Sequence, residues 1–252
     1  MKEQDRQRAI RLRLARMEAG PANPGSVAIP TGFAQLDRAL GAGGLPRSHI
    51  TELFGPSSSG KTTLLLQIIA HLQSSGLAAA WIDADRTFDP AYAAHLGVMV
   101  ERLPVAQPEA AEQALEIARQ LAGSGAVDLL VVDSAAALVP SLELEAGIGQ
   151  SAHGLHSRVL ASGLRKLASA VARTGAAVVF LNQTRWRPDE SGWEAETSAG
   201  GPPLKLYAAV RIALFAAGGR QIGFRVLKNK VSEGSPEGRL EWRRGVGFAK
   251  SP

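Results

Sequence analysis

The stretch Gly-Pro-Ser-Ser-Ser-Gly-Lys-Thr-Thr, from Gly55 to Thr63, is the most informative feature of this 252-residue chain. It matches the P-loop pattern, in which two spaced glycines are followed by Lys and then Ser or Thr. The apolar residues 50–54 before it predict a strand, and the run 64–72 after it predicts a helix, which is the context that the pattern requires. The sequence therefore predicts a loop whose backbone N–H groups and following helix N-terminus bind phosphate.

Each part of this stretch has an expected task in holding ATP. The Lys61 ammonium would reach the β- and γ-phosphates, and the Thr62 hydroxyl would face Mg²⁺. A glycine- and serine-rich loop with an incidental lysine is the alternative, but such a loop does not require a strand before it and a helix after it. The residues that we expect to bind the nucleotide are Gly55, Pro56, Ser57, Ser58, Ser59, Gly60, Lys61, Thr62 and Thr63.

The composition narrows the class of protein. Apolar residues make up 45% of the chain and charged residues 20%, which is ordinary for a globular protein with a buried core. No apolar run approaches the roughly 20 residues that a membrane span needs, and the charged N-terminus does not resemble a secretory signal, so we expect a cytoplasmic location and no membrane partner. The absence of cysteine excludes disulfides and cysteine-ligated zinc. A net charge of +5 is compatible with nucleic acid binding and equally with a role in solubility.

From residue 27 onward the apolar pattern alternates between strands and helices. This alternation predicts an α/β fold with a mostly parallel central sheet flanked by helices. The predicted strands are 50–54, 78–83, 129–133, 178–181, 211–215 and 223–228. The predicted helices are 62–74, 90–96, 110–123 and 151–174. The late strands follow each other closely, so we expect them to be antiparallel at one edge of the sheet.

Residues 1–26 differ from the core, which we expect to span 27–252. Arginines recur through a predicted helix at 2–19, and a stretch rich in Pro, Gly and Asn follows at 20–25. We interpret residues 1–26 as an N-terminal helical arm and linker. Both a solvated, partly frayed helix and an arm that binds DNA or a partner are compatible with this pattern.

Three of the predicted strands lead into polar residues, at the ends where open α/β sheets bind their ligands. The third strand ends in Asp133, at the position where P-loop enzymes hold Mg²⁺ through water. After the second strand, we expect Asp85 to orient and deprotonate the attacking water, with Asp83 as the structural alternative and helix capping as a role for either. After the fourth strand, Gln183 is expected to sense the γ-phosphate, unless it is a strand-end amide that satisfies backbone groups.

Together these motifs resemble the bacterial RecA recombinase family, which implies a RecA-like P-loop NTPase core. The resemblance extends from about residue 31 to residue 248, and it rests on the order and spacing of many short matches rather than on the P-loop alone. The matching segments are Thr31-Gly32 with Leu36-Asp37, residues 39–46, Ile82-Asp83-Ala84-Asp85 with Asp89-Pro90 and Tyr92, residues 113–116, 124–128, 131–138 and 165–168, Asn182-Gln183, Gly200-Gly201 and Lys228-Asn229-Lys230.

The resemblance implies further contacts to ATP. Asp89 and Tyr92 would contact adenine, and Trp242 falls near the same place in a looser alignment. Lys228 and Lys230 would reach the ATP of a neighbouring subunit, in the manner of arginine fingers. The resemblance therefore implies self-association into a filament or another oligomer.

The resemblance also implies two loops that bind single-stranded DNA, at residues 142–150 and 184–201. The second loop interleaves cations with tryptophans, and this agrees with its expected role, because arginine neutralises phosphate and tryptophan stacks on bases. Contact of the tryptophans with a protein is the alternative. The residues expected to bind DNA are Ser151, Arg158, Arg165, Arg185, Trp186, Arg187, Trp193, Gly200 and Gly201.

Three departures from the family pattern affect these expectations. Asp85 stands where the family has its glutamate general base, and its shorter side chain sets the carboxylate back by about 1.5 Å, the length of one C–C bond. Because a misplacement of about 1 Å can cost about 10²-fold in rate, we expect ATP to bind but to be hydrolysed slowly. Family members have a strand before the core that joins the sheet of the next subunit, and here only residues 26–30 are available to form it. The chain also stops soon after Phe248, without the family's C-terminal domain.

We therefore expect an ATP-dependent protein of the RecA type that binds single-stranded DNA. It would be a slow DNA-dependent ATPase in homologous recombination, DNA repair and the SOS response to DNA damage. The alternative is a RecA-like accessory protein of the ImuA type, a platform for error-prone DNA-repair polymerases with little strand exchange. The departures favour this alternative, whereas the intact P-loop, Lys228 and Lys230 oppose it. A RadA-type branch-migration factor is disfavoured, because its cysteine zinc finger and protease-like domain are missing.

Overall fold

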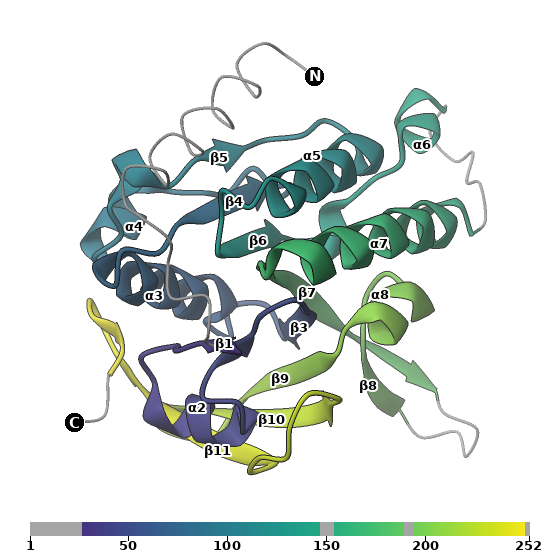
Figure 1. Cartoon of the computed structure of the whole chain (residues 1–252). Helices are drawn as coiled ribbons and strands as arrows, with labels where there is room; N and C mark the ends of the chain where they lie inside the picture. The colour runs from purple at the N-terminus through teal and green to yellow at the C-terminus, as the bar shows by residue number, and fades with distance from the viewer. Residues whose placement is uncertain (1–26, 147–153, 189–193, 250–252) are drawn as a thin grey trace.

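A computed structural model of the protein describes residues 27–146, 154–188 and 194–249, so the predicted arm at 1–26 lies outside the described part. One large sheet organises this part (Figure 1). Its strands are β3 (Ile50–Gly55), β4 (Ala79–Asp83), β5 (Val105–Ala106), β6 (Leu129–Asp133), β7 (Ala177–Pro188), β8 (Glu194–Ser198), β9 (Val210–Ala216), β10 (Gln221–Asn229), β11 (Glu237–Arg243) and β12 (Gly247–Phe248). They follow the order β12-β11-β10-β9-β3-β7-β6-β4-β5, and β8 pairs with β7 beside this path.

The half of the sheet from β9 to β5 is parallel, as the alternating pattern predicts. β3 pairs with β7 on one side and with β9 on the other, and β6 lies between β7 and β4. Parallel neighbours need long crossover connections, which the intervening helices supply. As a result, the carboxyl ends of β3, β7, β6 and β4 meet at one edge of the sheet.

Helices cover both faces of this parallel half. The long helices are α3 (Lys61–Ser74), α5 (Ala111–Gly123) and α7 (Leu155–Thr174). Successive residues of β6 alternate between two buried cores: Leu129 and Val131 lie in the core that contains α3, whereas Leu130 and Val132 lie in the core of α5 and α7. This burial on both faces explains the near-continuous apolar strand. None of the helices in the described part combines the length and apolarity that a membrane crossing requires.

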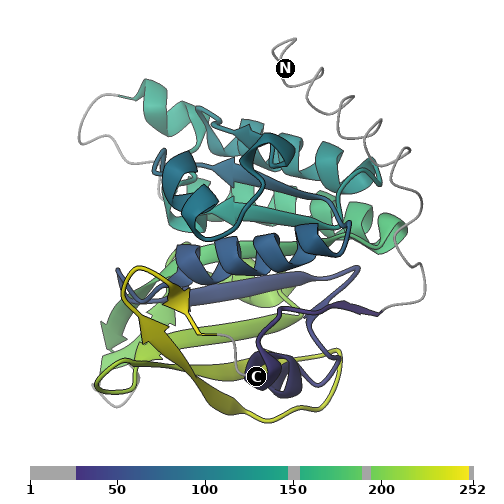
Figure 2. The same ribbon diagram turned by 90° about the vertical axis from the view of Figure 1, so that its left-hand side faces the viewer.

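The late strands form an antiparallel extension at one edge of the sheet, as predicted. Each of β9 to β12 pairs antiparallel with the next, and the strands coloured light green to yellow gather at one end of the molecule (Figure 2). The sequence pattern does not predict β11 or β12. β11 buries Leu240 and partly buries Trp242 among charged residues, which is too weak an alternation to identify a strand.

Short elements complete the fold. β1 (Ala28–Ile29) pairs antiparallel with β2 (Leu45–Pro46) in a separate small sheet. The short helices are α2 (Ala34–Leu40), α4 (Pro90–His95), α6 (Ser141–Glu145) and α8 (Pro202–Tyr207), with 3-10 turns at Val100–Arg102 and Ala135–Ala137.

The prediction of loops at the two DNA-binding segments is wrong in part. The segment 142–150 begins within α6, and the segment 184–201 begins as a continuation of β7. β7 runs on to Pro188 because β8 pairs with it from Thr184↔Ser198 onward and satisfies its backbone groups. Residues 147–153 and 189–193 lie outside the described part.

A buried carboxylate joins the P-loop strand to both of its neighbours. Glu52 on β3 is 0% exposed, and its carboxylate accepts hydrogen bonds from Arg211 Nε of β9 at 2.6 Å and from Asn182 Nδ2 of β7 at 2.9 Å. The Arg211 guanidinium also lies over the Phe54 ring, 4.9 Å from its centroid. Because the Glu52 and Arg211 charges are buried against each other, removing one of them leaves the other unpaired and poorly solvated.

We predict that Glu52→Ala lowers the free energy of unfolding by about 3–5 kcal/mol, because it leaves Arg211 without its counter-charge. Urea denaturation followed by circular dichroism measures the change. Glu241→Ala is the matched control, since Glu241 is 50% exposed and its partner Arg243 is 56% exposed. An exposed pair of this kind contributes less than about 1 kcal/mol. Equal losses in the two variants would contradict the prediction.

Candidate functional site

The strand ends bring several of the predicted site residues to one edge of the sheet. Gly55, the last residue of β3, is in register with Gln183 of β7. Asp83, the last residue of β4, is in register with Asp133 of β6. Since β6 and β7 are neighbours, the P-loop and the three polar strand ends lie along the same edge, where ligands bind in open α/β sheets.

The loop between β3 and α3 curls tightly around the Lys61 ammonium. Gly60 has a φ of 85°, and a Cβ there would lie 2.7 Å from the Phe248 ring, so this position requires glycine. Lys61 Nζ donates to the Gly55 carbonyl at 3.0 Å and to the Pro56 carbonyl at 2.7 Å. Burial lowers the pKa of Lys61. A cation and the N-terminus of a long helix thus meet at one point, which suits a phosphate group.

Thr62 and Asp133 meet beside this lysine. Thr62 Oγ1 donates to Asp133 Oδ2 at 3.1 Å. Asp133 is 6% exposed, and burial, followed by repulsion from Asp85, raises its pKa to about 6. A hydroxyl and carboxylates are the oxygen ligands that Mg²⁺ accepts directly or through water, and a cation here would relieve the repulsion between the two acids. The residues present therefore fit a magnesium ion.

Asp83 and Asp85 have different surroundings. Asp83 is 0% exposed, and its oxygens accept hydrogen bonds from Thr87 N at 3.0 Å, Phe88 N at 3.1 Å and Gln107 Nε2 at 2.8 Å. Asp83 therefore holds the loop after β4, the structural role that the sequence leaves open for it. Asp85 is partly exposed and accepts from Ser134 Oγ at 3.2 Å, and its charge acts on the pKa values of both Asp133 and Lys61.

The two residues expected at adenine lie on α4, beside the P-loop helix. Asp89 is the N-cap of α4, and its Oδ1 accepts from Ala91 N at 2.8 Å and Tyr92 N at 3.0 Å. The Tyr92 hydroxyl lies 2.8 Å from Thr63 Oγ1, and the tyrosine is 37% exposed. Asp89 thus has a capping role besides any contact to a base, and Tyr92 presents its ring close to the P-loop.

The C-terminal strands β11 and β12 pack against the same region, beside α3 and α4. The sequence pattern does not predict the residues that hold them there. Gln67 of α3 donates to the Phe248 carbonyl at 3.1 Å and accepts from Phe248 N at 2.8 Å. Trp242 packs against the Phe248 ring with their centroids 5.2 Å apart. His95 Nε2 lies 2.5 Å from the Gly245 carbonyl, linking α4 to the turn before β12. The sequence offers one signal for this contact, the glutamine within an apolar helix, because a buried amide needs hydrogen-bond partners.

Lys228 and Lys230 lie toward the opposite edge of the sheet from the P-loop. Lys228 of β10 is in register with Arg211 near the start of β9, and Lys230 N donates to the Ala209 carbonyl just before β9. Lys228 Nζ donates to the Lys205 carbonyl at 2.6 Å, and burial, followed by the charge of Lys230, lowers its pKa. One chain therefore does not bring these lysines to its own P-loop, and their contact with a neighbour's nucleotide stays a prediction.

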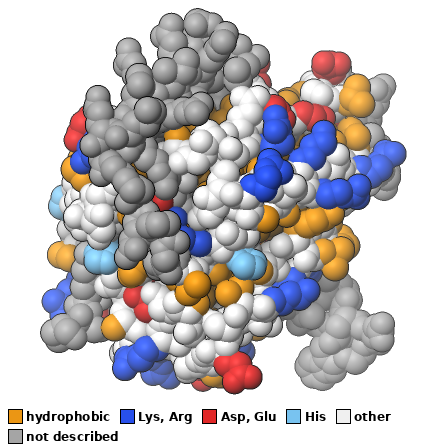
Figure 3. Space-filling model, in the orientation of Figure 1, with side chains coloured by type: hydrophobic (Ala, Val, Ile, Leu, Met, Phe, Trp, Pro, Cys, Tyr) orange, Lys and Arg blue, Asp and Glu red, His pale blue; other side chains and the backbone are white. Residues whose placement is uncertain are grey.

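The predicted DNA-binding residues in the described part are spread over α7 and the turn after β8. Arg158 and Arg165 are exposed on α7, and Figure 3 shows Lys and Arg side chains gathered over this helix and α5. Arg165 Nε donates to the Tyr207 hydroxyl at 3.3 Å, which links α7 to α8. Gly200 and Gly201, with φ values of 81° and 76°, form the turn between β8 and α8.

The remaining predicted DNA contacts are placed by their backbone or lie outside the described part. Arg185, Trp186 and Arg187 belong to β7, where they pair with β8 in the hairpin. Ser151 and Trp193 lie outside the described residues. Their roles stay predictions.

Comparison with known proteins finds relatives over almost the whole chain. The RecA N-terminal domain family matches residues 15–241. Protein RecA of Geobacter sulfurreducens is 43% identical over 98% of this chain and 79% of its own length. Protein RecA of Thermus thermophilus is 46% identical over 87% of this chain and 68% of its own length, and that of Rhodospirillum centenum is 48% identical over 81% and 60%. These matches and the P-loop sheet confirm the predicted family, and the chain belongs to the RecA family.

Proposed function

We propose that the protein is an ATP-dependent RecA-type recombinase that binds single-stranded DNA and acts in homologous recombination and DNA repair. The convergence of Lys61, Thr62, Asp133 and Asp85 at the carboxyl edge of the sheet carries this proposal. The relatives are proteins named RecA, and they give no specific support to an accessory protein of the ImuA type.

ATP with Mg²⁺ is the ligand that suits this loop. Lys61 would exchange its two loop carbonyls for the β- and γ-phosphates. Thr62 would ligate the metal directly, and Asp133 would hold it through water. Mg²⁺ supplies charge neutralisation between the phosphates when it is bound. Asp89 and Tyr92 would contact the adenine from α4.

Asp85 would act as the general base for hydrolysis. Asp83 is committed to the backbone of its own loop, whereas Asp85 is partly exposed and lies within electrostatic reach of Lys61. Asp85 would orient the attacking water and accept its proton. The side chain is one methylene shorter than glutamate, so the carboxylate sits about 1.5 Å further back. We therefore infer slow hydrolysis, because about 1 Å of misplacement can cost about 10²-fold in rate.

Gln183 would couple the nucleotide to the DNA-binding segment. The Gln183 carbonyl accepts from Ala199 N at 2.9 Å, and the neighbouring Asn182 Nδ2 donates to the Ala199 carbonyl at 3.0 Å. The base of the β7–β8 hairpin is therefore held at the residue that would sense the γ-phosphate. Movement there would be passed to Gly200 and Gly201, which follow directly, and such ordering of a segment is a common form of switching.

A second copy of the chain would complete the nucleotide site. Lys228 and Lys230 lie toward the edge of the sheet opposite the P-loop, so a head-to-tail contact would bring them to a neighbour's ATP. A head-to-tail contact repeats without closing unless its rotation forms a ring. This geometry supports self-association into a filament.

We predict that DNA binding depends on nucleotide through Lys61. With a non-hydrolysable ATP analogue, the wild-type protein should bind a labelled single-stranded oligonucleotide tightly, and the affinity should fall steeply with salt. Lys61→Ala should abolish this nucleotide-dependent binding, because it removes the cation that faces the phosphates. Fluorescence anisotropy measures both effects. Arg102→Ala, which removes an exposed cation elsewhere, is the control for net charge. Nucleotide-independent binding by the wild-type protein would disprove the coupling.

We predict that Asp85→Glu speeds hydrolysis by up to about 100-fold, because it moves the carboxylate toward the attacking water. Single-turnover measurements with bound ATP separate this chemical step from binding. Asp85→Asn keeps the size of the side chain but removes the base, so it should be slower than the wild-type protein. An unchanged or lower rate with glutamate would count against Asp85 as the base.

We predict helical filaments when the protein is mixed with ATP and single-stranded DNA, because the site lacks lysines that a second copy supplies. Electron microscopy of the wild-type protein tests this. Lys61→Ala and the double variant Lys228→Ala with Lys230→Ala should both fail to form filaments. Discrete particles with the wild-type protein would instead favour an accessory platform.

A further inference from the structure

The turn between β11 and β12, residues 243–247, lies across the side of the nucleotide site and contacts two of its helices. We call these residues the strap. His95 of α4 bonds to the strap on one side, and Gln67 of α3 bonds to it on the other. Phe248, which follows the strap, lies against the P-loop, since a Cβ on Gly60 would be 2.7 Å from its ring. Both Figure 1 and Figure 2 show the yellow end of the chain beside α3.

The two ends of the strap are held unequally. On the α3 side, the buried Gln67 amide donates to the Val246 carbonyl at 3.3 Å and to the Phe248 carbonyl at 3.1 Å, and it accepts from Phe248 N at 2.8 Å. On the α4 side, the described residues provide a single side-chain bond, between His95 Nε2 and the Gly245 carbonyl. A carbonyl only accepts, so the imidazole donates. His95 is exposed, and the α4 end is therefore the weaker one.

The strap has little support of its own. β12 pairs with β11 at two positions, and even longer two-stranded ladders are marginal in water. Gly247 has a φ of 86°, and a Cβ there would lie 2.7 Å from Gln67 Oε1, so glycine lets the amide reach the backbone. The place of the strap therefore depends on its bonds to Gln67 and His95.

The weaker end of the strap lies on the side of the site that is proposed to hold the base. Tyr92 and His95 are three residues apart on α4, which makes them neighbours on one face of the helix. The Tyr92 hydroxyl lies 2.8 Å from Thr63 Oγ1, at the start of the P-loop helix, whereas His95 reaches the strap. The firmer end adjoins the phosphate side, because Phe248 lies against Gly60. Opening of the weaker end would thus expose the base and leave the P-loop in place.

We propose that His95 is a positioning residue for the nucleotide: its bond to Gly245 holds the strap closed beside the base, and the nucleotide leaves when this bond opens. The inference rests on the proposed function, since it requires a nucleotide on the P-loop. Segments with few buried contacts open at little cost in free energy, and the opening of such segments often sets the rate of ligand release. Gln67 and Phe248 form the fixed end about which the strap moves.

His95→Phe tests the bond, because it keeps a ring but removes the donor. Release of a non-hydrolysable ATP analogue with a fluorescent group on its ribose should be about fivefold faster than from the wild-type protein, the loss expected for one hydrogen bond. Stopped-flow displacement with excess unlabelled analogue and Mg²⁺ measures the rate. Inorganic tripolyphosphate has no base, so in competition it should bind both proteins equally. His95→Gln places an amide donor at about the same reach and should restore the wild-type rate.

His49→Phe is the matched control. His49 Nδ1 also lies beside a backbone carbonyl, 2.7 Å from that of Arg47, but just before the amino end of β3. The same substitution there should leave the rate of release unchanged. Equal acceleration in His49→Phe and His95→Phe would show a general loosening of the fold and would overturn the inference.

A reversible link tests the opening itself. The chain has no cysteine, so His95→Cys combined with Val246→Cys gives a protein with two thiols, one on α4 and one on the strap. Val246 is 56% exposed and accessible to reagents. Without a link, this protein should release the analogue as fast as His95→Phe. Bridging the thiols with a bifunctional methanethiosulfonate after loading should slow release below the wild-type rate, and dithiothreitol should reverse the effect. Equal release with and without the link would overturn the inference.

The outcomes separate this inference from the proposed function. Tight binding of the analogue, with a rate of release that His95→Phe does not change, would overturn the role of the strap and leave the recombinase proposal in place. A His95→Phe variant that loses as much affinity for tripolyphosphate as for the analogue would place the effect at the P-loop, and this too would overturn the inference. Failure of the wild-type protein to bind the analogue would overturn both proposals.

Discussion

The buried carboxylate of Glu52 ties the P-loop strand to the strands on both sides of it. It lies on the strand that leads into the P-loop, and it holds β9 through Arg211 and β7 through Asn182. Asn182 in turn donates to the Ala199 carbonyl, at the base of the hairpin. A buried carboxylate tolerates little displacement of its partners, so these strands keep one register. That register places Gly55 beside Gln183, and thereby the P-loop beside the segment proposed to bind DNA.

The sheet separates its charges between two opposite edges. At the carboxyl edge, Asp133 lies near Asp85 and Lys61, and burial, followed by repulsion from Asp85, raises the pKa of Asp133. This crowding is unfavourable for the protein alone, and a bound metal cation would relieve it. Toward the amino edge, burial, followed by the charge of Lys230, lowers the pKa of Lys228. The carboxyl edge thus carries an excess of negative charge, and the amino edge an excess of positive charge. In a head-to-tail assembly, the lysines of one copy would offset the negative charge of the next copy's carboxylates and nucleotide.

Much of the fold and of the nucleotide site could be predicted from local sequence. The central strands and long helices follow from apolar periodicity, and the continuous apolar run before Asp133 predicts its place at the end of a strand. The hairpin after Gln183 does not follow from the local sequence, because its strands are polar and gain their stability from pairing with each other. The contact between the Gln67 amide and Phe248 does not follow from the local sequence either, since the partners of the amide lie at the far end of the chain.

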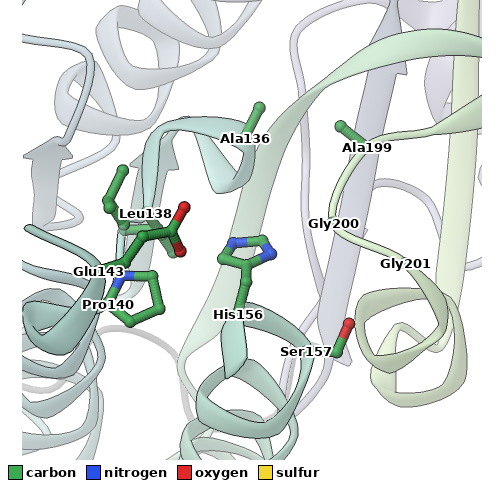
Figure 4. Close-up of a pocket in the computed structure, with 10 residues that line it drawn as sticks. Ala136, Leu138, Pro140, Glu143, His156, Ser157, Ala199, Gly200 and Gly201 are labelled. Carbon is green, nitrogen blue, oxygen red and sulfur yellow. The ribbon is translucent and has the colours of Figure 1, made fainter. Parts of the chain in front are cut away.

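The P-loop, the alternation of the central strands with the long helices, and the family all follow from the sequence alone, because glycine spacing and apolar alternation act over a few neighbouring residues. The tertiary structure is needed to tell the two nearby aspartates apart: Asp83 accepts a hydrogen bond from Gln107, in the segment that follows β5. It also decided that Glu143, His156 and Gly200 line one cavity (Figure 4). These outcomes depend on contacts between segments far apart in the chain, and such contacts are set by sheet order and helix packing rather than by local pattern.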